Sequence, residues 1–331
     1  LLDHGVLYFA PDTAEESYRC ALQAHPLSDD DEHLVIFTDY PAGLSCLEPV
    51  YFIGADSAIL VAAVPRSSND ESCRRRVLDV CCGSGVGAVA AARYIASAER
   101  VCAIDLNPRA VRLTRFNAAV NGVAHRIEAC VGDLFVPVAG ERFDLVLANP
   151  PFVPCPASSP GESKSVALFG GGGCDGEEIT RRIVAGARAV LTDGGRLVLS
   201  AVMPNPRSAP ARLRAFWRSE DETRAAAAAV AVAHVRPCEG AVYAERAAGH
   251  AGLASAANDW ITHYAREGIG EMATAVALVS KTTTAEEEEE LEGETIEVAG
   301  VGVLAERRSE GDGRAPVWSL LDSRINNASD S

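Results

Sequence analysis

The region from residue 75 to residue 203 alternates short apolar segments with helical ones, and this alternation restricts the folds open to the chain. Apolar strands are predicted at 75–80, 100–106, 126–134, 144–150 and 194–203. Helices are predicted between them, at 85–98, 108–122 and 177–191. Strands that alternate with helices of about 10 to 15 residues form a parallel sheet with helices on both faces. We therefore expect a doubly wound α/β domain.

The segments that flank this region are less regular. Residues 1–75 predict an N-terminal subdomain or lid that contains one helix, at 56–64. Beyond Met203 the pattern predicts helices at 211–229 and 258–268 and strands at 229–235 and 273–284. We expect the main domain to span 76–284. An acidic insertion and tail follow at 285–331, and the segment at 295–308 can return to the sheet as an edge strand.

The composition is that of a folded, acidic protein. Of the 331 residues, 48% are hydrophobic, which is enough for a sizeable core. The formal net charge is −16, and residues 285–331 alone hold thirteen acidic residues against four arginines. Binding to phosphate backbones normally relies on clusters of Lys and Arg. Bulk electrostatics therefore disfavour a nucleic-acid partner, although a local basic groove stays open.

The cysteine and histidine spacing tests for a metal site, and the hydropathy pattern tests for a membrane span or a secretion signal. The ten cysteines and seven histidines form no pair or cluster with zinc-site spacing, so we predict no metal site. No run of eighteen apolar residues and no basic-then-apolar start is present, so we expect a cytoplasmic protein without a membrane partner. Because residue 1 is leucine, we expect the chain to be trimmed, and a targeting segment can have preceded it.

A glycine loop follows the first strand of the α/β region, in VLDVCCGSGVG (77–87). Gly83 and Gly85 lack a Cβ, so a ligand can lie against the backbone where the next helix begins. Twenty residues beyond Gly85, Asp105 ends the second strand, where an acid can accept both hydroxyl hydrogens of a ribose. Leu106 and Asn107 follow it as further candidates. The combination predicts a nucleoside-containing cofactor.

Two more strand-end acids help to choose among such cofactors. The loop spacing, with Ala88 at the last position, does not exclude a dinucleotide. Asp79 would repel a pyrophosphate but tolerate the ammonium group of S-adenosylmethionine, which favours the latter; a carboxylate that braces the loop is the alternative. Asp133 is suited to accept from an adenine amino group, with Leu134 beside it to cover the base.

With these motifs together, residues 50–202 resemble the class I S-adenosylmethionine-dependent methyltransferases. The motifs are LDVCCGSG, AIDLNPRAV, GDLF and ANPPF, and the last is similar to the N-P-P-[YF] motif of HemK-type glutamine methyltransferases and of other small-domain methyltransferases. The resemblance implies a Rossmann-like sheet of seven strands, mostly parallel with late antiparallel strands. Cys81 departs from the pattern, because many relatives have glycine there and a residue with a Cβ resists positive φ.

The ANPPF segment supplies the predicted catalytic residues. An amide or aromatic amino nitrogen is a poor nucleophile, so it must be polarised and held in line with the methyl group. The side-chain oxygen of Asn149 and the main-chain carbonyl of Pro150 can each accept one N–H of such a group. Pro150 and Pro151 keep the acceptors rigid, and Phe152 offers a face for stacking. Asn149 is also counted among the cofactor-binding candidates.

Upstream, VYFIGADSAILVAAV (50–64) is similar to the segment that lies over the cofactor in glutamine-modifying relatives. Asp56 and Ser57 are therefore candidate wall residues, with helix capping as the alternative role.

The methyl acceptor stays open at this stage. An amide in a protein is favoured by the ANPPF and glycine-rich stretches together. A small molecule of specialised metabolism and an RNA base amino group are the enzymatic alternatives, and a cofactor-binding activator subunit is the non-enzymatic one. The sequence leaves the oligomeric state undetermined.

Overall fold

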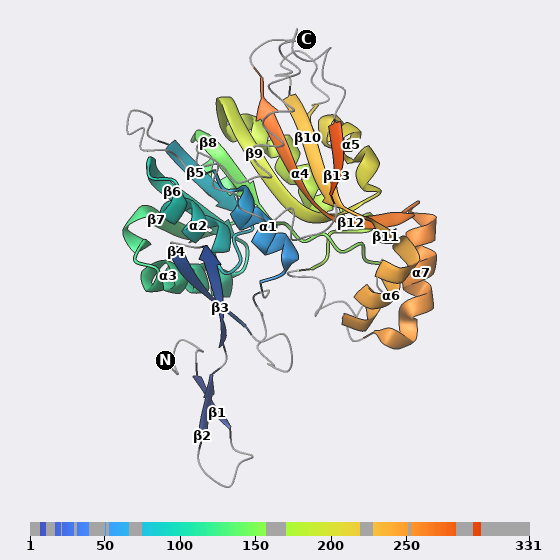
Figure 1. Ribbon diagram of the computed structural model, residues 1–331, viewed down its shortest axis with the longest axis horizontal. Coiled ribbons are helices and arrows are strands. Elements are labelled where there is room, and N and C mark those ends of the chain that lie inside the picture. Colours follow the sequence, from blue (N-terminus) through green and yellow to red (C-terminus); the bar gives the residue numbers. More distant parts are fainter. Residues whose placement is uncertain are drawn as a thin grey trace.

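The computed structural model describes residues 7–10, 17–20, 22–29, 32–39, 50, 53–65, 75–156, 170–218, 228–250, 253–282 and 294–298. One large sheet runs through the centre, and helices lie against both of its faces (Figure 1). Two small hairpins precede the sheet in the chain, and a pair of helices lies beyond one end of it. Within these ranges, no helix has the length and apolar character needed to cross a bilayer.

The central sheet has the strand order of a doubly wound fold. Its order is β13 (Glu294–Val298), β10 (Ala228–Val235), β12 (Glu271–Lys281), β9 (Leu191–Pro204), β8 (Phe143–Ala148), β5 (Arg75–Val80), β6 (Ala98–Asp105) and β7 (Ile127–Val131), with β11 (Cys238–Glu239) beside β12. The strands from β7 to β9 are parallel, and β12 is antiparallel to both β9 and β10. The predicted fold class is confirmed. β13 corresponds to the edge strand expected after residue 294, and β11 is a short strand that the sequence did not predict.

The helices divide between the two faces because successive residues of each strand point to opposite sides. Val77 of β5 packs in the core with α1 (Ala55–Ala63), α2 (Val86–Tyr94) and α3 (Pro108–Val120). Leu78, its neighbour, packs in the core with α4 (Glu178–Val190) and α5 (Ala209–Trp217). Both residues are fully buried. α1, which falls in the segment predicted as the N-terminal subdomain, thus packs on the main sheet.

Two predicted helices are shorter than expected. The helix predicted at 85–98 ends at Tyr94, because the Arg126 guanidinium donates to the carbonyls of Ala92, Ile95, Ala96 and Ala98 and the chain turns there into β6. The helix predicted at 211–229 is wrong at its end. α5 stops at Trp217, and Ala228 and Ala229 already pair with β12, so burial in the sheet overrides the helical preference of alanine. Residues 219–227 lie outside the described residues.

The N-terminal strands form two hairpins, β1 (Leu7–Ala10) with β2 (Ser17–Cys20) and β3 (Leu22–Asp29) with β4 (Glu32–Asp39). β4 lies beside α3 (Figure 1). Asn117 on α3 bonds both the N–H and the carbonyl of Phe37, and Asn121 does the same for Val35. Asp39 pairs with Arg109 at the start of α3 and also accepts the Val50 N–H. The second hairpin is therefore attached to the main domain by polar contacts.

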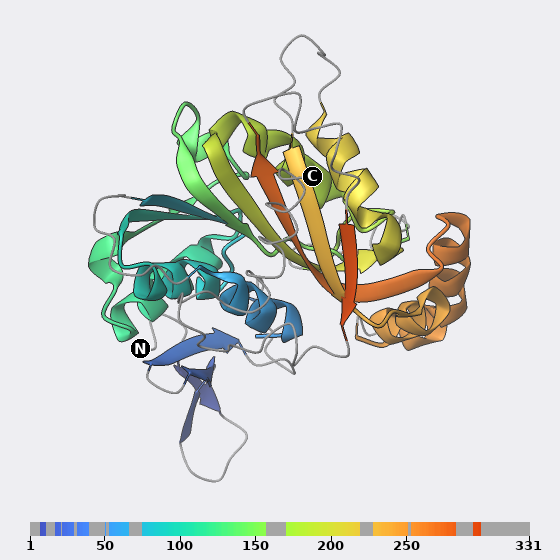
Figure 2. The same cartoon turned by 45° about the horizontal axis from the view of Figure 1, so that its top comes forward.

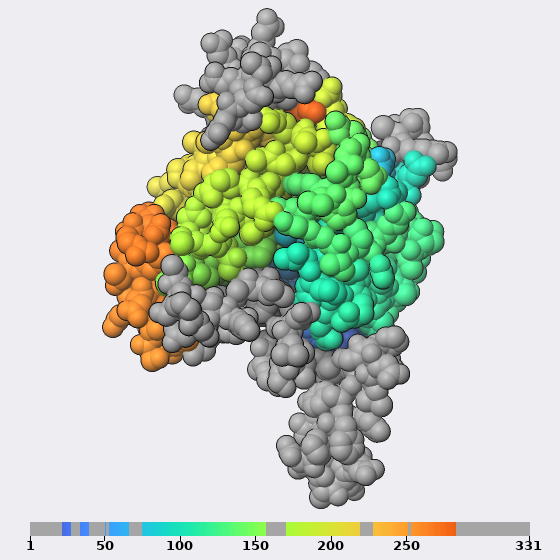
Figure 3. Space-filling model, turned by 180° about the vertical axis from the view of Figure 1, so that it is seen from behind, coloured from blue at the N-terminus to red at the C-terminus, as the bar shows by residue number. Residues whose placement is uncertain are grey.

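The helix pair at the other end consists of α6 (Gly240–His250) and α7 (Ala257–Arg266). Trp260, Tyr264 and Ala244 are buried between them and Met272 of β12. The pair forms a lobe beside the sheet in Figure 2, and its orange atoms stand at one side of the molecule in Figure 3. The sequence predicts α7 but not α6.

Candidate active site

A cavity of about 700 Å³ lies where the parallel strands end at their carboxyl ends. It is lined by the glycine loop after β5, the start of α1, the Asn149–Val153 segment and part of α6. The predicted site residues that line it are Asp56, Ser57, Asp79, Cys81, Gly83, Asp105, Leu106, Asn107, Asp133, Leu134, Asn149, Pro150, Pro151 and Phe152. Gly85 is not among the lining residues.

The glycine loop has three residues in the left-handed conformation. Cys81 has φ +58°, Gly83 +54° and Gly85 +81°. A Cβ on Gly83 would meet nothing within 4 Å, whereas a Cβ on Gly85 would lie 2.7 Å from the Thr114 side chain. Gly83 thus leaves open space in the cavity, and Gly85 permits close packing against α3. Cys81 adopts the conformation that the sequence argument considered difficult, at a cost of about 1–2 kcal/mol.

Asp105 holds the loop in place from the end of β6. One carboxylate oxygen accepts the Gly83 N–H at 2.8 Å, and the other accepts the Asn107 N–H at 2.8 Å. Asn107 in turn caps α3, because its side-chain oxygen accepts the Arg109 N–H. Burial raises the pKa of Asp105, and the two backbone hydrogen bonds oppose that rise. Since an ionised carboxylate has about four acceptor positions, Asp105 retains the capacity to accept from hydroxyl groups.

Asp79 is buried beneath the start of α2. Its carboxylate accepts the Ala88 N–H at 2.7 Å, and a Cβ on Gly87 would lie 2.9 Å from the same oxygen. Burial is the main cause that raises the pKa of Asp79 to about 7, and the nearby Asp105 adds to the rise while the Ala88 hydrogen bond opposes it. Asp79 therefore braces the helix and also lines the cavity.

Asp133 and Leu134 lie at the outer side of the cavity, after β7. Asp133 pairs with Arg182 of α4 at 2.7 Å, and both side chains are about half exposed. Leu134 has φ +47°, and Leu106, which also lines the cavity, is 64% exposed. The cavity lining thus includes two apolar side chains as well as the Asp133 carboxylate.

Asn149 directly follows β8, whose last residue, Ala148, pairs with Val80 and Leu199. The Asn149 side-chain nitrogen donates to the Asp56 carboxylate at 2.6 Å, with Ser57 Oγ at 3.4 Å. Within the described part of the chain, no hydrogen bond is made to the Asn149 side-chain oxygen. That oxygen is therefore the polar atom that Asn149 can offer to a ligand.

The segment after Asn149 is held by the glycine-rich loop before α4. Val153 and Gly171 form a parallel bridge, with the Val153 N–H donating to the Gly170 carbonyl and the Gly172 N–H donating to the Val153 carbonyl, both at 2.8 Å. A Cβ on Gly176 would lie 2.6 Å from the Phe152 carbonyl oxygen. The glycines thus let the two loops approach closely, and this contact places Phe152 at the cavity.

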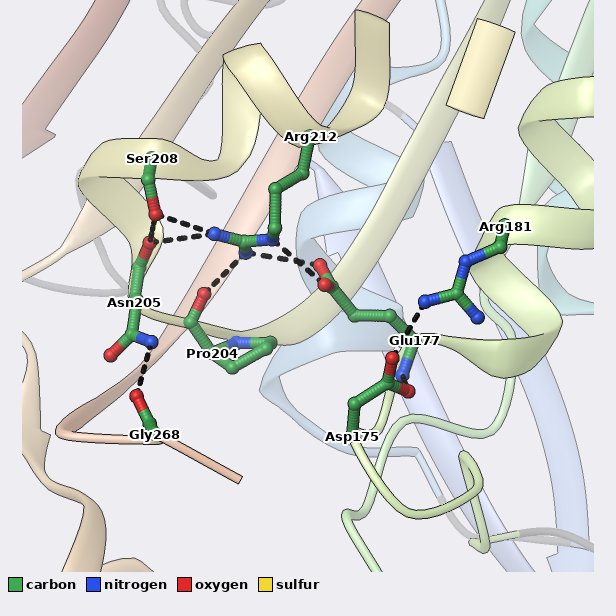
Figure 4. Close-up of polar contacts among 8 residues, drawn as sticks. All are labelled: Asp175, Glu177, Arg181, Pro204, Asn205, Ser208, Arg212 and Gly268. Carbon is green, nitrogen blue, oxygen red and sulfur yellow. Dashed lines mark hydrogen bonds and ion pairs between the residues drawn. The ribbon is translucent and has the colours of Figure 1, made fainter. Parts of the chain in front are cut away.

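A polar network anchors the glycine-rich loop to the rest of the domain (Figure 4). Glu177 accepts two hydrogen bonds from Arg212 of α5, at 2.8 and 3.0 Å. The same guanidinium donates to the carbonyls of Pro204 and Asn205 and to the Ser208 hydroxyl. On the other side of the loop, the buried His263 of α7 contacts the Cys174 carbonyl at 2.8 Å.

α6 supplies a wall that sequence reasoning missed. Tyr243, Arg246, Ala247 and His250 line the cavity beside Val153 and Gly170. A signal for this helix exists, because Ala244, Ala247 and Ala248 are buried at helical spacing. Alanine is small and is also common in strands and loops, so the stripe is weak in the sequence.

A protein-family model named methyltransferase small domain matches residues 53–160, which run from the start of α1 past Phe152. Residues 53–160 are thus similar to a methyltransferase small domain. The resemblance that the motifs predict is thereby confirmed. The match covers the strand-end acids, the glycine loop and the Asn149–Phe152 segment.

Curated relatives are similar to part of the chain. A ribosomal protein uL3 glutamine methyltransferase of Bradyrhizobium diazoefficiens is 37% identical over 126 residues, which is 37% of this chain and 39% of that protein. A release factor glutamine methyltransferase of Deinococcus radiodurans is 37% identical over 154 residues, 44% of this chain and 52% of that protein. The chain thus spans about half, or less, of the length of these relatives.

Solved structures also resemble the chain, at low identity. A methyltransferase from Agrobacterium tumefaciens has a TM-score of 0.45 at 17% identity, covering 84% of this chain and 77% of that one. A Thermus thermophilus 16S rRNA methyltransferase, in complex with AdoMet and guanosine, has a TM-score of 0.37 at 19% identity, covering 55% of this chain and 42% of that one.

Proposed function

We propose that the protein is an S-adenosylmethionine-dependent methyltransferase that methylates an amide nitrogen, with a glutamine-type side chain of a protein as acceptor. The observation that carries the proposal is the Asn149 amide, which lines the cavity with its nitrogen engaged by Asp56. Its oxygen is left to accept an N–H of the acceptor. The names of the glutamine-methylating relatives support the same acceptor class.

The residues of the cavity fit the cofactor. Gly83 leaves space where a Cβ would stand, Asp105 keeps acceptor capacity for ribose hydroxyls, and Asp79 offers a carboxylate for an ammonium group. Asp133 would accept from the adenine amino group, with Leu106 and Leu134 against the ring. When bound, this cofactor supplies an electrophilic methyl group on a sulfonium sulfur.

The acceptor would be held by the segment that follows β8. The Asn149 side-chain oxygen and the Pro150 carbonyl would each accept one N–H of the acceptor amide, and Phe152 would stack on its plane. All peptide bonds of the described residues are trans, and the buried Pro150 ring fixes the chain at this point. Holding two reactants in line can supply ~7 kcal/mol or more of the barrier, so a strong general base is not required.

The experiment that tests the proposal is labelling with tritiated cofactor. The wild-type protein is incubated with protein, RNA and small-metabolite pools, and with paired peptides that differ only in glutamine against glutamate. We expect label in protein and in the glutamine peptide, and none in the glutamate peptide. Label confined to RNA or to metabolites would reject the acceptor class, and label in no pool would reject the enzyme.

Two variants separate cofactor binding from turnover in this assay. Asp105→Ala should remove cofactor binding in isothermal titration, because the ribose and the Gly83 N–H lose their common partner. Asn149→Ala should bind the cofactor and lose turnover by about 100-fold or more, the scale seen when one oriented polar group is removed from a transition state. Equal turnover by Asn149→Ala and wild type would exclude the proposed role of the amide.

A further inference from the structure

We propose that Asp56 is a positioning residue that fixes which end of the Asn149 amide faces the acceptor, and thereby restricts the acceptor to N–H donors. This inference rests on the proposed function and deepens it. Asp56 lies 93 positions before Asn149, on a different element, and its carboxylate is the close partner of the Asn149 side-chain nitrogen.

Asp56 and Asn149 differ in their hydrogen-bonding chemistry. When ionised, the Asp56 carboxylate only accepts hydrogen bonds, whereas an asparagine amide donates at one end and accepts at the other. At 2.6 Å from Asp56, the Asn149 nitrogen is the end that satisfies both partners. Ser57, at 3.4 Å, has a hydroxyl that can donate or accept, so it would tolerate either orientation. The orientation is therefore set by Asp56.

Both sides of this contact are held by buried elements. Asp56 is 5% exposed in the first turn of α1, where the helix N-terminus favours a negative charge. Its main-chain carbonyl accepts the hydroxyl hydrogen of Ser200 at 2.8 Å, and Ser200 is fully buried on β9. Leu199 of β9 pairs with Ala148 of β8, which directly precedes Asn149. The strand β9 therefore both bonds to α1 and lies beside Asn149.

The consequence is that the site selects an acceptor group that donates N–H hydrogen bonds. With its oxygen facing the cavity, Asn149 matches an NH₂ group and repels a carboxylate or carbonyl oxygen. A site that pairs with a substrate N–H rejects an analogue that lacks it by factors of up to about 10⁴ to 10⁵. The same amide in the reverse orientation would present an N–H and lose this selectivity. Asp56 thus separates a glutamine-type acceptor from a glutamate-type one.

The decisive variant is Asp56→Asn, which keeps the size of the side chain and allows either amide orientation. We expect kcat for a glutamine-type acceptor to fall about tenfold to a hundredfold, the range of a hydrogen bond to a charged group. Isothermal titration of the same variant measures cofactor affinity, because Asp56 also lines the cavity, and separates a loss of kcat from a change in cofactor binding. In the Asn149→Ala background, Asp56→Ala should cost nothing further, because its partner is gone. Asp193→Asn, an exposed acid on β9 paired with Lys281, is the matched control.

A second readout does not depend on turnover. In protein labelled with ¹⁵N at asparagine side chains, the Asn149 NH₂ signal is assigned by its loss in Asn149→Ala. We expect slow hydrogen exchange of this signal in wild type and faster exchange with a changed shift in Asp56→Asn. Asp56→Glu, which keeps the charge, should restore part of both readouts, and it serves if Asp56→Asn does not fold.

The outcomes separate the two proposals. If no acceptor is labelled by the wild type, the proposed function fails, while the Asn149 signal still decides the role of Asp56. An Asn149 signal that is identical in wild type and Asp56→Asn would overturn the inference. Losses of kcat that multiply in the Asp56→Ala, Asn149→Ala double variant would also overturn it, because they would mean independent action.

Discussion

At the scale of single residues, the cavity gathers carboxylates that burial disfavours. The pKa values of Asp56, Asp79 and Asp105 are all raised, and desolvation is the largest cause in each case. Hydrogen bonds from backbone N–H groups and from Asn149 oppose the rise. A ligand that carries positive charge would relieve this cost, since it favours the ionised forms.

Asp79 gives a pH dependence with a definite sign. Because burial raises its pKa to about 7, the carboxyl is largely protonated below that pH and ionised above it. A cofactor with an ammonium group favours the ionised form, so binding should release protons near pH 7 and tighten as pH rises through 7. Titration calorimetry in buffers of different ionisation enthalpy measures this release. Asp79→Asn should release fewer protons, and an unchanged release would contradict the prediction.

The raised pKa of Asp79 also makes the stability of the unliganded protein depend on pH, and this stability falls as pH rises. The folded state binds the Asp79 proton more tightly than the unfolded chain, whose carboxyl has the ordinary pKa of 3.8. The contribution of Asp79 is therefore fully present below pH 3.8 and is lost as pH rises towards 7. Urea unfolding of wild type and Asp79→Asn at several pH values should show a difference that changes in this window.

At the scale of elements, α6 faces the cavity beside the segment proposed to hold the acceptor. Arg246 and His250 are exposed at this wall. Arg246→Ala should raise KM for the acceptor by about tenfold, the effect of about 1.4 kcal/mol, and leave cofactor affinity unchanged. Glu245→Ala, an exposed neighbour on the same helix that does not line the cavity, is the control. A KM equal to wild type would assign α6 a purely structural role.

The Glu177–Arg212 pair links α4 to α5 and is largely buried (Figure 4). Arg212→Ala leaves the Glu177 carboxylate without its two charged hydrogen bonds, so unfolding free energy should fall by about 3 kcal/mol. Arg181→Ala removes an exposed pair with Asp175 and should cost less than about 1 kcal/mol. Chemical denaturation measures the unfolding free energy of both variants. Equal losses of unfolding free energy would contradict the larger contribution predicted for the buried pair.

At the scale of the whole molecule, attachment of the second hairpin should contribute to stability. Asn117 is fully buried, and its amide bonds Phe37 at two atoms and the Ser84 carbonyl in the glycine loop. Asn117→Ala leaves the partly buried Phe37 N–H and carbonyl and the buried Ser84 carbonyl without their partner, so we expect a loss of about 2–3 kcal/mol. Thermal unfolding measures the loss, and Arg112→Ala on the same helix is an exposed control. Equal unfolding temperatures for the two variants would show that the Asn117 contacts do not contribute to stability.

The sequence predicts the sheet and the strand-end residues because both depend on local signals. Alternating apolar runs determine the layers. Asp79 and Asp105 lie at the ends of β5 and β6, Asp133 and Asn149 follow β7 and β8, and these strand ends must meet at one edge of the sheet. The Asp56–Asn149 contact could not be predicted, because 93 positions separate the partners and neither residue signals the other. α6 was missed because its buried stripe is alanine, and the alanines at 228–229 favoured a helix where tertiary pairing imposes a strand.

Asn117 of α3 and Asn121 at its C-terminal end also affect the edge of strand β4. They satisfy the N–H and carbonyl groups of Val35 and Phe37, which lie on the side of β4 that β3 does not pair with. An unsatisfied strand edge of this kind recruits strands from other molecules. Helix α3 therefore acts as a substitute neighbouring strand, and it protects a short two-stranded ribbon from edge-to-edge self-association.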